Sequence, residues 1–428
     1  MNFYYWMNYK KTTLKNGLRI LTIPVVGTQT ATVMVMVGVG GRYETEKQAG
    51  LSHFIEHMLF KGTTKRPTAQ SISEELDGIG GEFNAFTAAD KTAYYAKVDS
   101  NHINKALDVI TDIFLNSKLE QVEIDRERGP ILQELSMYED EPRRIVGVEF
   151  EKMLYPNQPL GRELVGYKHT INAFTRKDFV AYMKKYYNSS ETVVCVAGKF
   201  DEKKIIKQIQ DNFSVMNVGK KVTFKKVIEK QLKPAVHIKF KKTDQTHLIV
   251  GTRAYHQNHK DRYVLALLSI ILGGNMSSRM FIEIRERRGL AYFVHTSVDT
   301  YQDCGYIGTQ AGVEHANLEK TVETILGEYR KIATEKVDIK ELQKAKDYVK
   351  GRAVMGFEAS DDVAMFFIDQ EMHKEKIMTP KEVFARIDEV TVDDILRVSR
   401  DIFKNNKLNL AIVGPHKNNK KLEAILNI

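Results

Sequence analysis

The stretch from Gly50 to Thr63 reads GLSHFIEHMLFKGT, and it places His53, Glu56 and His57 within five residues. On an α-helix, residues four apart lie about 40° apart around the axis, so the two histidines share one face. Glu56 projects from the same side of the helix, about 60° from His53 and about 100° from His57. The remaining positions are apolar and would bury the helix against a core: Phe54, Ile55, Met58 and Leu59.

This spacing is the H-x-x-E-H pattern of zinc hydrolases. Two imidazoles one helical turn apart can hold a metal ion, while the carboxylate beside them handles protons. A histidine on an apolar helix is more often a core residue. The motif alone therefore leaves a metal site and a packed pair of histidines as alternatives, and the rest of the chain has to decide between them.

The chain has 428 residues, of which 43% are hydrophobic and 28% are charged, a composition typical of soluble globular proteins. This length predicts two or more domains. No apolar run approaches the roughly 18 residues that cross a bilayer, and residues 1–7 are too short for a signal peptide. Two cysteines, Cys195 and Cys304, favour free thiols in a reducing compartment. We therefore expect a cytoplasmic protein without a membrane segment.

The formal net charge of +9 indicates either an anionic partner or a well-solvated basic surface. The basic residues are spread along the chain and cluster mainly at 220–221, 225–226 and 417–421. No module that combines basic and aromatic residues for nucleic acid is present in the sequence. We therefore expect a solvated surface and no nucleic-acid partner.

An internal repeat divides the chain. Thr175 begins a segment with the predicted order helix, strand, glycine and helix, and Thr391 begins the same order 216 residues later. The two strands, at 192–197 and 408–413, are apolar at matching positions. The repeat predicts two similar halves, residues 1–216 and 235–428, which a lysine-rich linker at 217–234 joins.

A separate helix, predicted from Glu120 to about Tyr138, carries Glu127 and Glu134 two turns apart on one face. Pro130 inside it predicts a kink or a local break. Glu134 follows the histidine pair by enough chain to bring a third metal ligand from another element. The second half has an apolar segment without histidine at 262–272, where the first half has its motif helix, so we expect a metal in the first half only.

With these features the sequence resembles the M16 metallopeptidase family, which includes pitrilysin, insulin-degrading enzyme and the mitochondrial processing peptidases. The resemblance spans essentially the whole chain and fits the short M16B-like subfamily. It implies an α+β, LuxS/MPP-like metallohydrolase fold of two homologous halves, each a mostly antiparallel β-sheet packed with helices, in a clamshell assembly. Besides the motif, the matching segments are Gly40–Glu44, Gly80–Thr87, Glu127–Glu134, Gly273–Arg279 and Ile284–Tyr292.

The resemblance makes His53, His57 and Glu134 the ligands of one Zn²⁺ per chain. It makes Glu56 the general base that activates the water at this ion, with a pKa for that water of about 7. Glu127 becomes a supporting carboxylate that orients a ligating histidine or the Glu134 helix. For Glu127, an ordinary exposed helix glutamate stays the alternative.

The resemblance also implies a substrate site. Arg285 and Tyr292 would donate hydrogen bonds to the scissile carbonyl and to the oxyanion that develops from it. By itself, Arg285 reads as an ordinary surface residue of a charged helix. The segment Asn84–Thr87 would form an edge strand to which an extended peptide adds through main-chain hydrogen bonds, with Asn84, Ala85 and Phe86 as its substrate-binding residues.

The expected function is that of a zinc endopeptidase that cleaves peptides or unfolded segments inside a closed chamber. Because one chain holds both the ligand set and the Arg/Tyr pair, a homodimer with two sites is the simplest expectation. The alternatives are a non-catalytic assembly subunit of the core-protein type and a catalytic subunit that requires a non-identical partner.

Overall fold

The computed structural model describes residues 7–373, 376–418 and 420–428. Residues 1–6, on which the expectation of a missing signal peptide rests, lie outside this described part. The contacts divide the chain into two compact units. Unit 1 consists of Met1–Leu135, Arg162–Lys225 and Ala353–Val383, and unit 2 consists of Ser136–Gly161, Lys226–Arg352 and Phe384–Ile428.

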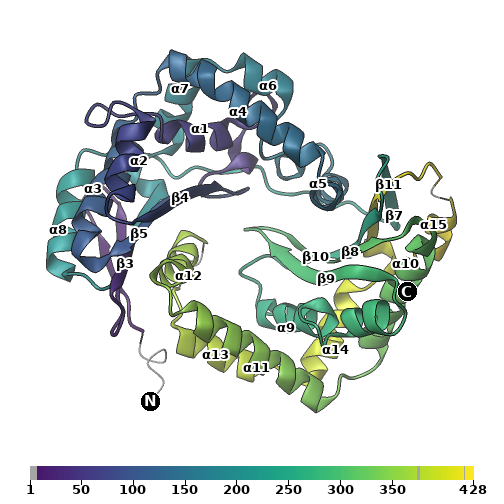
Figure 1. Ribbon diagram of the computed structural model, residues 1–428. Coiled ribbons are helices and arrows are strands. Elements are labelled where there is room, and N and C mark those ends of the chain that lie inside the picture. The colour runs from purple at the N-terminus through teal and green to yellow at the C-terminus, as the bar shows by residue number, and fades with distance from the viewer. Residues whose placement is uncertain (1–6, 374–375, 419) are drawn as a thin grey trace. The chain divides into compact units, whose positions relative to one another are not determined.

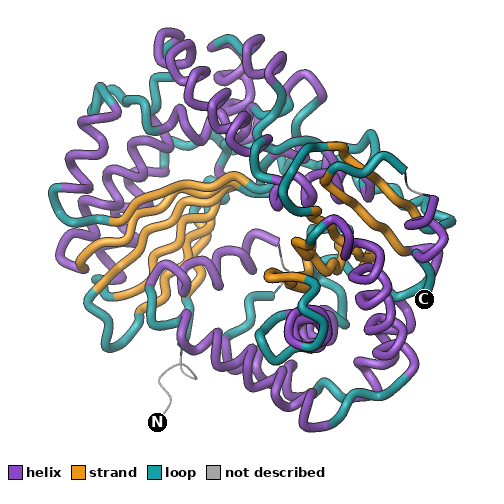
Figure 2. The backbone as a smooth tube through the Cα atoms, turned by 45° about the vertical axis from the view of Figure 1, so that its right-hand side comes forward, coloured by secondary structure: helices purple, strands orange, loops and turns teal. Residues whose placement is uncertain are grey.

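Unit 1 is built on a six-stranded sheet with the order β1-β2-β6-β3-β5-β4. Only β2 and β6 pair in parallel, and the other neighbours are antiparallel. Figure 2 shows these strands side by side in one sheet. The strands are β1 (Lys10–Thr13), β2 (Arg19–Pro24), β3 (Thr30–Val37), β4 (Glu82–Thr87), β5 (Thr92–Asp99) and β6 (Thr192–Gly198).

Helices cover both faces of this sheet, which explains why the central strands β3 and β6 are apolar and buried almost throughout. Helix α3 (Ile103–Asn116) packs on β3 and β5, and α12 (Ser360–His373) packs on β6, β3 and β2. Figure 1 shows α3 on one side of the sheet and α12 on the other. The other helices of this unit are α1 (Leu51–Leu59), α2 (Ala69–Asp77), α6 (Lys168–Ala173), α7 (Arg176–Tyr186) and α8 (Glu202–Phe213).

Unit 2 repeats this plan with a five-stranded sheet in the order β7-β11-β8-β10-β9. Here too, only one pair, β7 and β11, is parallel. The order matches β2-β6-β3-β5-β4 of unit 1 position by position, so the predicted repeat is also a structural repeat. The strands are β7 (Ala235–Phe240), β8 (Thr246–Ala254), β9 (Ala291–Thr300), β10 (Gly305–Val313) and β11 (Leu408–Gly414).

The helices of unit 2 also lie on both faces of their sheet. Helix α5 (Pro142–Leu154) packs on β11, β8 and β7, and α9 (Arg262–Gly273) packs on β9 and on α14 (Val392–Ile402). Figure 1 shows α5 on one side of this sheet and α9 and α14 on the other. The remaining helices after β10 are α10 (Leu318–Thr334), α11 (Ile339–Gly356), α13 (Pro380–Asp388) and α15 (Lys420–Ile425), of which α11 and α13 cross a boundary between the units.

The units exchange one helix each relative to the contiguous halves 1–216 and 235–428 expected from the repeat. Helix α5 comes from the first half of the sequence but belongs to unit 2, and α12 comes from the second half but belongs to unit 1. The physical reason is that each sheet has an apolar face that its own half leaves uncovered. Residues 217–234, all of them described, contain no helix or strand.

Three further expectations concern single features. Of the kink or local break predicted at Pro130, the break is absent, since helix α4 (Gln121–Glu139) continues through this residue. The proline lacks an N–H, so the helix forgoes only one of its many backbone hydrogen bonds there. Among the described residues, neither Cys195 nor Cys304 forms a disulfide bond, and both side chains are buried. Among the described residues, no helix combines the length and the apolar character that crossing a membrane requires.

Candidate metal centre

Helix α1 carries the H-x-x-E-H motif and begins at a buried cap. The carboxylate of Glu44 accepts hydrogen bonds from the backbone N–H groups of Gly50 at 2.9 Å and of Ser52 at 2.6 Å. Burial raises the pKa of Glu44 to about 7, although these hydrogen bonds lower it in part. Gly50 has a φ of 93°, and a Cβ atom there would lie 2.4 Å from the carbonyl oxygen of Val165. Only glycine therefore fits this entry into the helix.

His53 and His57 project from α1 toward Glu134 on α4. The Nε2 atom of each histidine lies 3.6 Å from Oε2 of Glu134. One ligand atom from each of the three residues lies within 4.8 Å of the other two, and the described residues contain no other such group. A packed pair of core histidines would not need to direct both rings at one carboxylate, so this geometry favours the metal site.

The three side chains fit a zinc ion. Two ligand atoms about 2.0 Å from zinc at the tetrahedral angle are about 3.3 Å apart. The two observed separations of 3.6 Å are close to this value. Neutral imidazole nitrogens and a carboxylate oxygen are ordinary zinc ligands, and three protein ligands leave a fourth position for water.

Glu127 contacts the Nδ1 atom of His57, whereas the Nε2 atom of the same ring faces Glu134. The Oε1 atom of Glu127 lies 3.0 Å from Nδ1 of His57, and its Oε2 atom lies 2.6 Å from Nζ of Lys61. Burial alone would raise the pKa of Glu127, but the hydrogen bonds from His57 and Lys61 outweigh it and lower the pKa. Glu127 is only 6% exposed, which excludes the alternative of an ordinary exposed glutamate. A hydrogen bond from Nδ1–H of His57 leaves its Nε2 free to bind a metal.

Glu56, the predicted general base, is half-buried on the same helix. Its Oε2 atom accepts a hydrogen bond from the hydroxyl of Thr87, the last residue of β4. Helix α1 packs against β4, which explains why a residue 31 positions away reaches the motif. The side chain of Glu56 is thus held by the strand that contains the predicted substrate segment.

The predicted substrate segment, Asn84, Ala85 and Phe86, lies in the middle of β4. This strand pairs with β5 on one side and forms the edge of the sheet on the other. The Asn84 side chain is exposed, and its Oδ1 accepts a hydrogen bond from the backbone N–H of Ala85. The segment therefore has the position that strand addition requires.

Arg285 and Tyr292 lie together in unit 2, whereas the zinc ligands belong to unit 1. Arg285 is in the π-helix Phe281–Glu286, and Tyr292 is in the edge strand β9. The guanidinium carbon lies 4.6 Å from the centre of the Tyr292 ring, and Nη1 donates to the Tyr292 carbonyl oxygen at 3.2 Å. Tyr292 is 79% exposed, so its hydroxyl is accessible.

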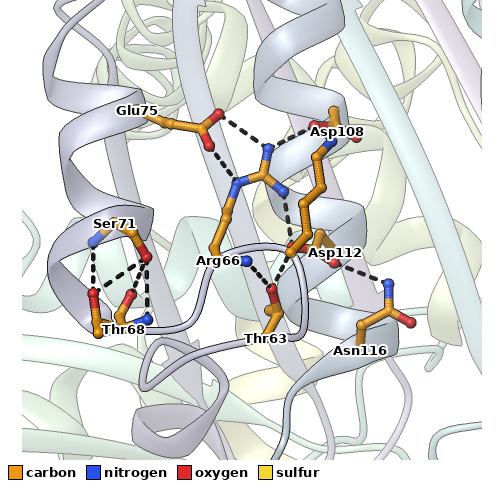
Figure 3. A network of polar contacts seen from close by, with 9 residues as sticks. Thr63, Arg66, Thr68, Ser71, Glu75, Asp108, Asp112 and Asn116 are labelled. Atoms are coloured by element: carbon orange, nitrogen blue, oxygen red, sulfur yellow. Dashed lines mark hydrogen bonds and ion pairs between the residues drawn. The ribbon is translucent and has the colours of Figure 1, made fainter.

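An ionic network around the buried Arg66 holds the loop between α1 and α2, which follows the H-x-x-E-H motif (Figure 3). The Thr63 hydroxyl donates to Asp112 of α3 at 2.6 Å and accepts from the backbone N–H of Arg66. The guanidinium of Arg66, which is 2% exposed, binds Asp112, Asp108 and Glu75. Because these contacts fix the loop between α1 and α2 to α3, they also fix the C-terminal end of α1.

Lys61 is not among the site residues predicted from the sequence, and Thr87 is predicted only as the end of the substrate strand, although both contact residues of the site. Lys61 follows His57 by four positions, and this spacing indicates that both side chains lie on the same face of the helix. Its partner Glu127 is on a different helix, so the sequence could not reveal the pair. For Thr87 the sequence indicates a place in the substrate strand, but it carries no signal for the hydrogen bond to Glu56.

Comparison with known sequences identifies two matching family models. The model described as "Insulinase (Peptidase family M16)" matches residues 19–168, and "Peptidase M16 inactive domain" matches residues 173–349. A protein of Rickettsia felis named "Uncharacterized zinc protease" is 37% identical over 420 residues, which cover 96% of this chain and 98% of that protein. "Uncharacterized zinc protease YmxG" of Bacillus subtilis is 32% identical over 413 residues, which cover 96% of this chain and 99% of that protein.

Solved structures have the same fold. A protease from Helicobacter pylori matches with a TM-score of 0.89 at 23% identity, over 96% of this chain and 100% of that one. A structure titled peptidase M16 inactive domain, from Pseudomonas fluorescens, matches with a TM-score of 0.88 at 17% identity, over 96% and 98% of the two chains. The predicted α+β fold of two similar halves is therefore confirmed.

Proposed function

This chain belongs to peptidase family M16, and from that membership we propose that it is a zinc-dependent endopeptidase acting on peptides or unfolded polypeptide segments. The observation that carries the proposal is the convergence of His53 and His57 of α1 with Glu134 of α4, whose ligand atoms lie within 4.8 Å of one another. Helix α1 also carries Glu56. The relatives named zinc proteases support zinc as the metal.

The side chains divide the chemistry between them. When bound, zinc supplies a Lewis acid that polarises the scissile carbonyl and lowers the pKa of a water to about 7. Glu56 accepts a proton from the attacking water on its carboxylate and passes it to the nitrogen of the leaving amine. Thr87 holds this carboxylate through its hydroxyl, and Glu127 fixes the tautomer of His57 through Nδ1.

Strand β4 is the element to which we assign the extended peptide. The opposite edge of the sheet, β1, is only four residues long and carries Lys10 and Lys11, which are devices that discourage pairing with another strand. Strand β4 has six residues and neither lysine nor proline. This contrast supports β4, with Asn84, Ala85 and Phe86 along it, as a strand left open for peptide addition.

We assign Arg285 and Tyr292 as hydrogen-bond donors to the substrate carbonyl and its oxyanion. Their side chains lie together at the start of edge strand β9, and both carry donors suited to an oxygen that gains negative charge. The closed chamber that the resemblance implies stays a prediction.

For the assembly we propose a homodimer, because one chain contains both the ligand set and the Arg/Tyr pair. Light scattering of the purified protein measures its molar mass against 49.0 kDa for one copy. An active monomer would contradict this assembly, and activity that appears only with another protein would favour a catalytic subunit with a non-identical partner. The intact ligand set argues against a non-catalytic assembly subunit.

The decisive experiment is cleavage of a quenched fluorescent peptide by the purified chain and by Glu56→Gln. The amide cannot accept the proton, so we expect kcat/KM to fall about 10²- to 10⁴-fold. Zinc content should stay that of the wild type, because Glu56 is not one of the three proposed ligands. A chelator should abolish the wild-type activity, and added zinc should restore it.

Glu46→Gln is the matched control, since Glu46 is exposed and lies ten residues before Glu56. Its activity should equal that of the wild type. Peptide cleavage that survives both chelation and Glu56→Gln would contradict the proposed mechanism. A wild-type chain that binds zinc but cleaves no peptide, alone or as a dimer, would instead favour one of the two alternatives.

A further inference from the structure

We propose that Lys61 is a positioning residue of the metal centre, which acts on His57 through Glu127. The inference rests on the proposed function in one respect, that His57 is a zinc ligand. It concerns a residue that lies outside the H-x-x-E-H motif and outside the proposed ligand set.

The contacts form a chain of three groups. Nζ of Lys61 lies 2.6 Å from Oε2 of Glu127, and Oε1 of the same carboxylate lies 3.0 Å from Nδ1 of His57. Each carboxylate oxygen therefore has one partner. A carboxylate bound at both oxygens cannot rotate without losing a charge-assisted hydrogen bond.

The position of Lys61 in the chain makes this contact local to the motif. Helix α1 ends at Leu59, and the backbone N–H of Lys61 still bonds the carbonyl oxygen of Met58 at 3.1 Å. Lys61 thus continues the turn of His57, four residues on, and both side chains reach the same glutamate of α4. His57 at the end of α1 and Lys61 just after it thus hold the Glu127 carboxylate of α4 from two sides.

The burial of Glu127 separates this pair from an ordinary surface salt bridge, which contributes little. The side chain of Glu127 is 9% exposed and that of Lys61 is 25% exposed. A surface pair offers a comparison: Lys65, four residues after Lys61, lies 2.5 Å from Asp108, and these two side chains are 58% and 39% exposed. Water therefore screens the Lys61 pair much less. Removing Lys61 leaves a buried carboxylate at Glu127 whose remaining partner is His57.

The consequence for the metal is steric and electronic. With Glu127 fixed, the Nδ1–H group of His57 has a fixed acceptor. The Nε2 lone pair of His57 then points toward Glu134, whose Oε2 atom lies 3.6 Å from Nε2. With Lys61 removed, the carboxylate is free to turn, and the ring loses its defined orientation. Zinc affinity should therefore respond to a residue that does not touch the metal.

The test is the zinc dissociation constant of the full chain, measured by competition with a chromogenic chelator. For Lys61→Met we expect zinc binding to weaken about 10-fold or more, the range found for partners of ligating histidines. Lys61→Gln, which keeps a polar side chain, should weaken binding in the same way. Lys65→Met is the matched control, and its zinc affinity should equal that of the wild type.

A double-mutant cycle shows whether Lys61 acts through Glu127. Glu127→Gln alone should weaken zinc binding. Adding Lys61→Met to it should cause little further loss, because the carboxylate through which Lys61 acts on His57 is already absent. Additive losses would overturn the inference, and so would a Lys61→Met variant that binds zinc as the wild type does.

The outcomes for this inference and for the proposed function are separate. A wild-type chain that binds zinc without cleaving peptides contradicts the endopeptidase function but leaves the affinities of the Lys61 variants decisive. A wild-type chain that binds no zinc at all overturns both.

Discussion

Thr87 links strand β4 to the side chain of Glu56, the proposed base. Its hydroxyl donates to Oε2 of Glu56, while its backbone is the last position of β4. A carboxylate that must accept a proton in one direction benefits from a fixed orientation. The end of the proposed peptide-binding strand thus sets the position of the proposed base.

We predict that Thr87→Val lowers kcat and leaves KM and zinc affinity unchanged. Valine has the same branched shape and keeps the strand, but it cannot donate a hydrogen bond. A hydrogen bond to a charged group contributes about 1.5–3 kcal/mol, which corresponds to a kcat about 10- to 100-fold lower. Steady-state kinetics with a fluorescent peptide, together with a zinc titration, measure all three quantities.

Two variants control this prediction. Thr87→Ser keeps the hydroxyl and should retain most of the wild-type kcat. Thr13→Val changes an exposed threonine of the other edge strand, β1, and should have no effect. A Thr87→Val variant with lower zinc affinity, or with a higher KM and an unchanged kcat, would show that the threonine supports the strand rather than the base.

The residues of the candidate site differ in how far the sequence could predict them. The pair His53 and His57 follows from helical spacing alone, because one helix fixes their relative positions. Glu134 follows from the family resemblance and from the helix face that it shares with Glu127. Lys61 and Thr87 enter the site only because α4 and β4 dock against α1, and no pattern within a single element encodes that docking.

At the scale of elements, α5 shows how a helix from one half of the sequence is bound to the other unit. Glu149 on α5 accepts from Nε2 of His237 at 2.9 Å and from Nζ of Lys239 at 3.0 Å, both on β7. Burial alone would raise the pKa of Glu149, but His237, Lys152 and Lys239 lower it to about 2. Glu149 is thus one of the polar anchors of α5, together with Glu151, which accepts hydrogen bonds from the hydroxyls of Tyr301 and Tyr306.

We predict that Glu149→Gln destabilises unit 2 by about 1–3 kcal/mol at neutral pH, because charge-assisted hydrogen bonds are lost. The folded-state pKa of about 2 is below the ordinary value of 4.5. The stabilisation is therefore full above about pH 4.5 and is lost as the pH falls toward 2. Denaturant unfolding of the wild type and the variant at pH 7 and pH 3 should show a smaller difference at pH 3.

Glu141→Gln, at the exposed start of the same helix, is the control and should change stability little at either pH. A loss for Glu149→Gln that is equal at pH 7 and pH 3 would mean that the carboxylate charge is not what stabilises this contact.

Most elements could be predicted from local patterns, but their assignment to a unit could not. The strands around β3 and β6 are visible as apolar runs, and the repeat aligns α7 and β6 with α14 and β11. The exchange of α5 and α12 is invisible in the sequence, because an amphipathic helix fits the apolar face of either sheet. Hydroxyl contacts such as that of Ser360 of α12 with Thr32 of β3, at 2.8 Å, appear only in the folded unit.

For the whole molecule, the duplicated topology predicts unequal responses of the two units to metal. All three proposed zinc ligands lie in unit 1, and the described part of unit 2 holds no comparable group of ligands. Family membership and the repeat could both be inferred from the sequence. The limits of the unit that responds to metal could not, because that unit includes α12 from the far end of the chain.

We predict that zinc raises the unfolding temperature of unit 1 and leaves that of unit 2 unchanged. A ligand at about 100 times its dissociation constant stabilises the state that binds it by about 2.7 kcal/mol. For a unit of this size, that corresponds to about 5–11 °C. Scanning calorimetry of the metal-free and zinc-loaded chain should show one transition that moves and one that does not. His57→Ala should abolish the shift and leave both metal-free transitions in place. If both transitions move together with zinc, the two units unfold as one cooperative body, and the division of the chain into independent units is wrong.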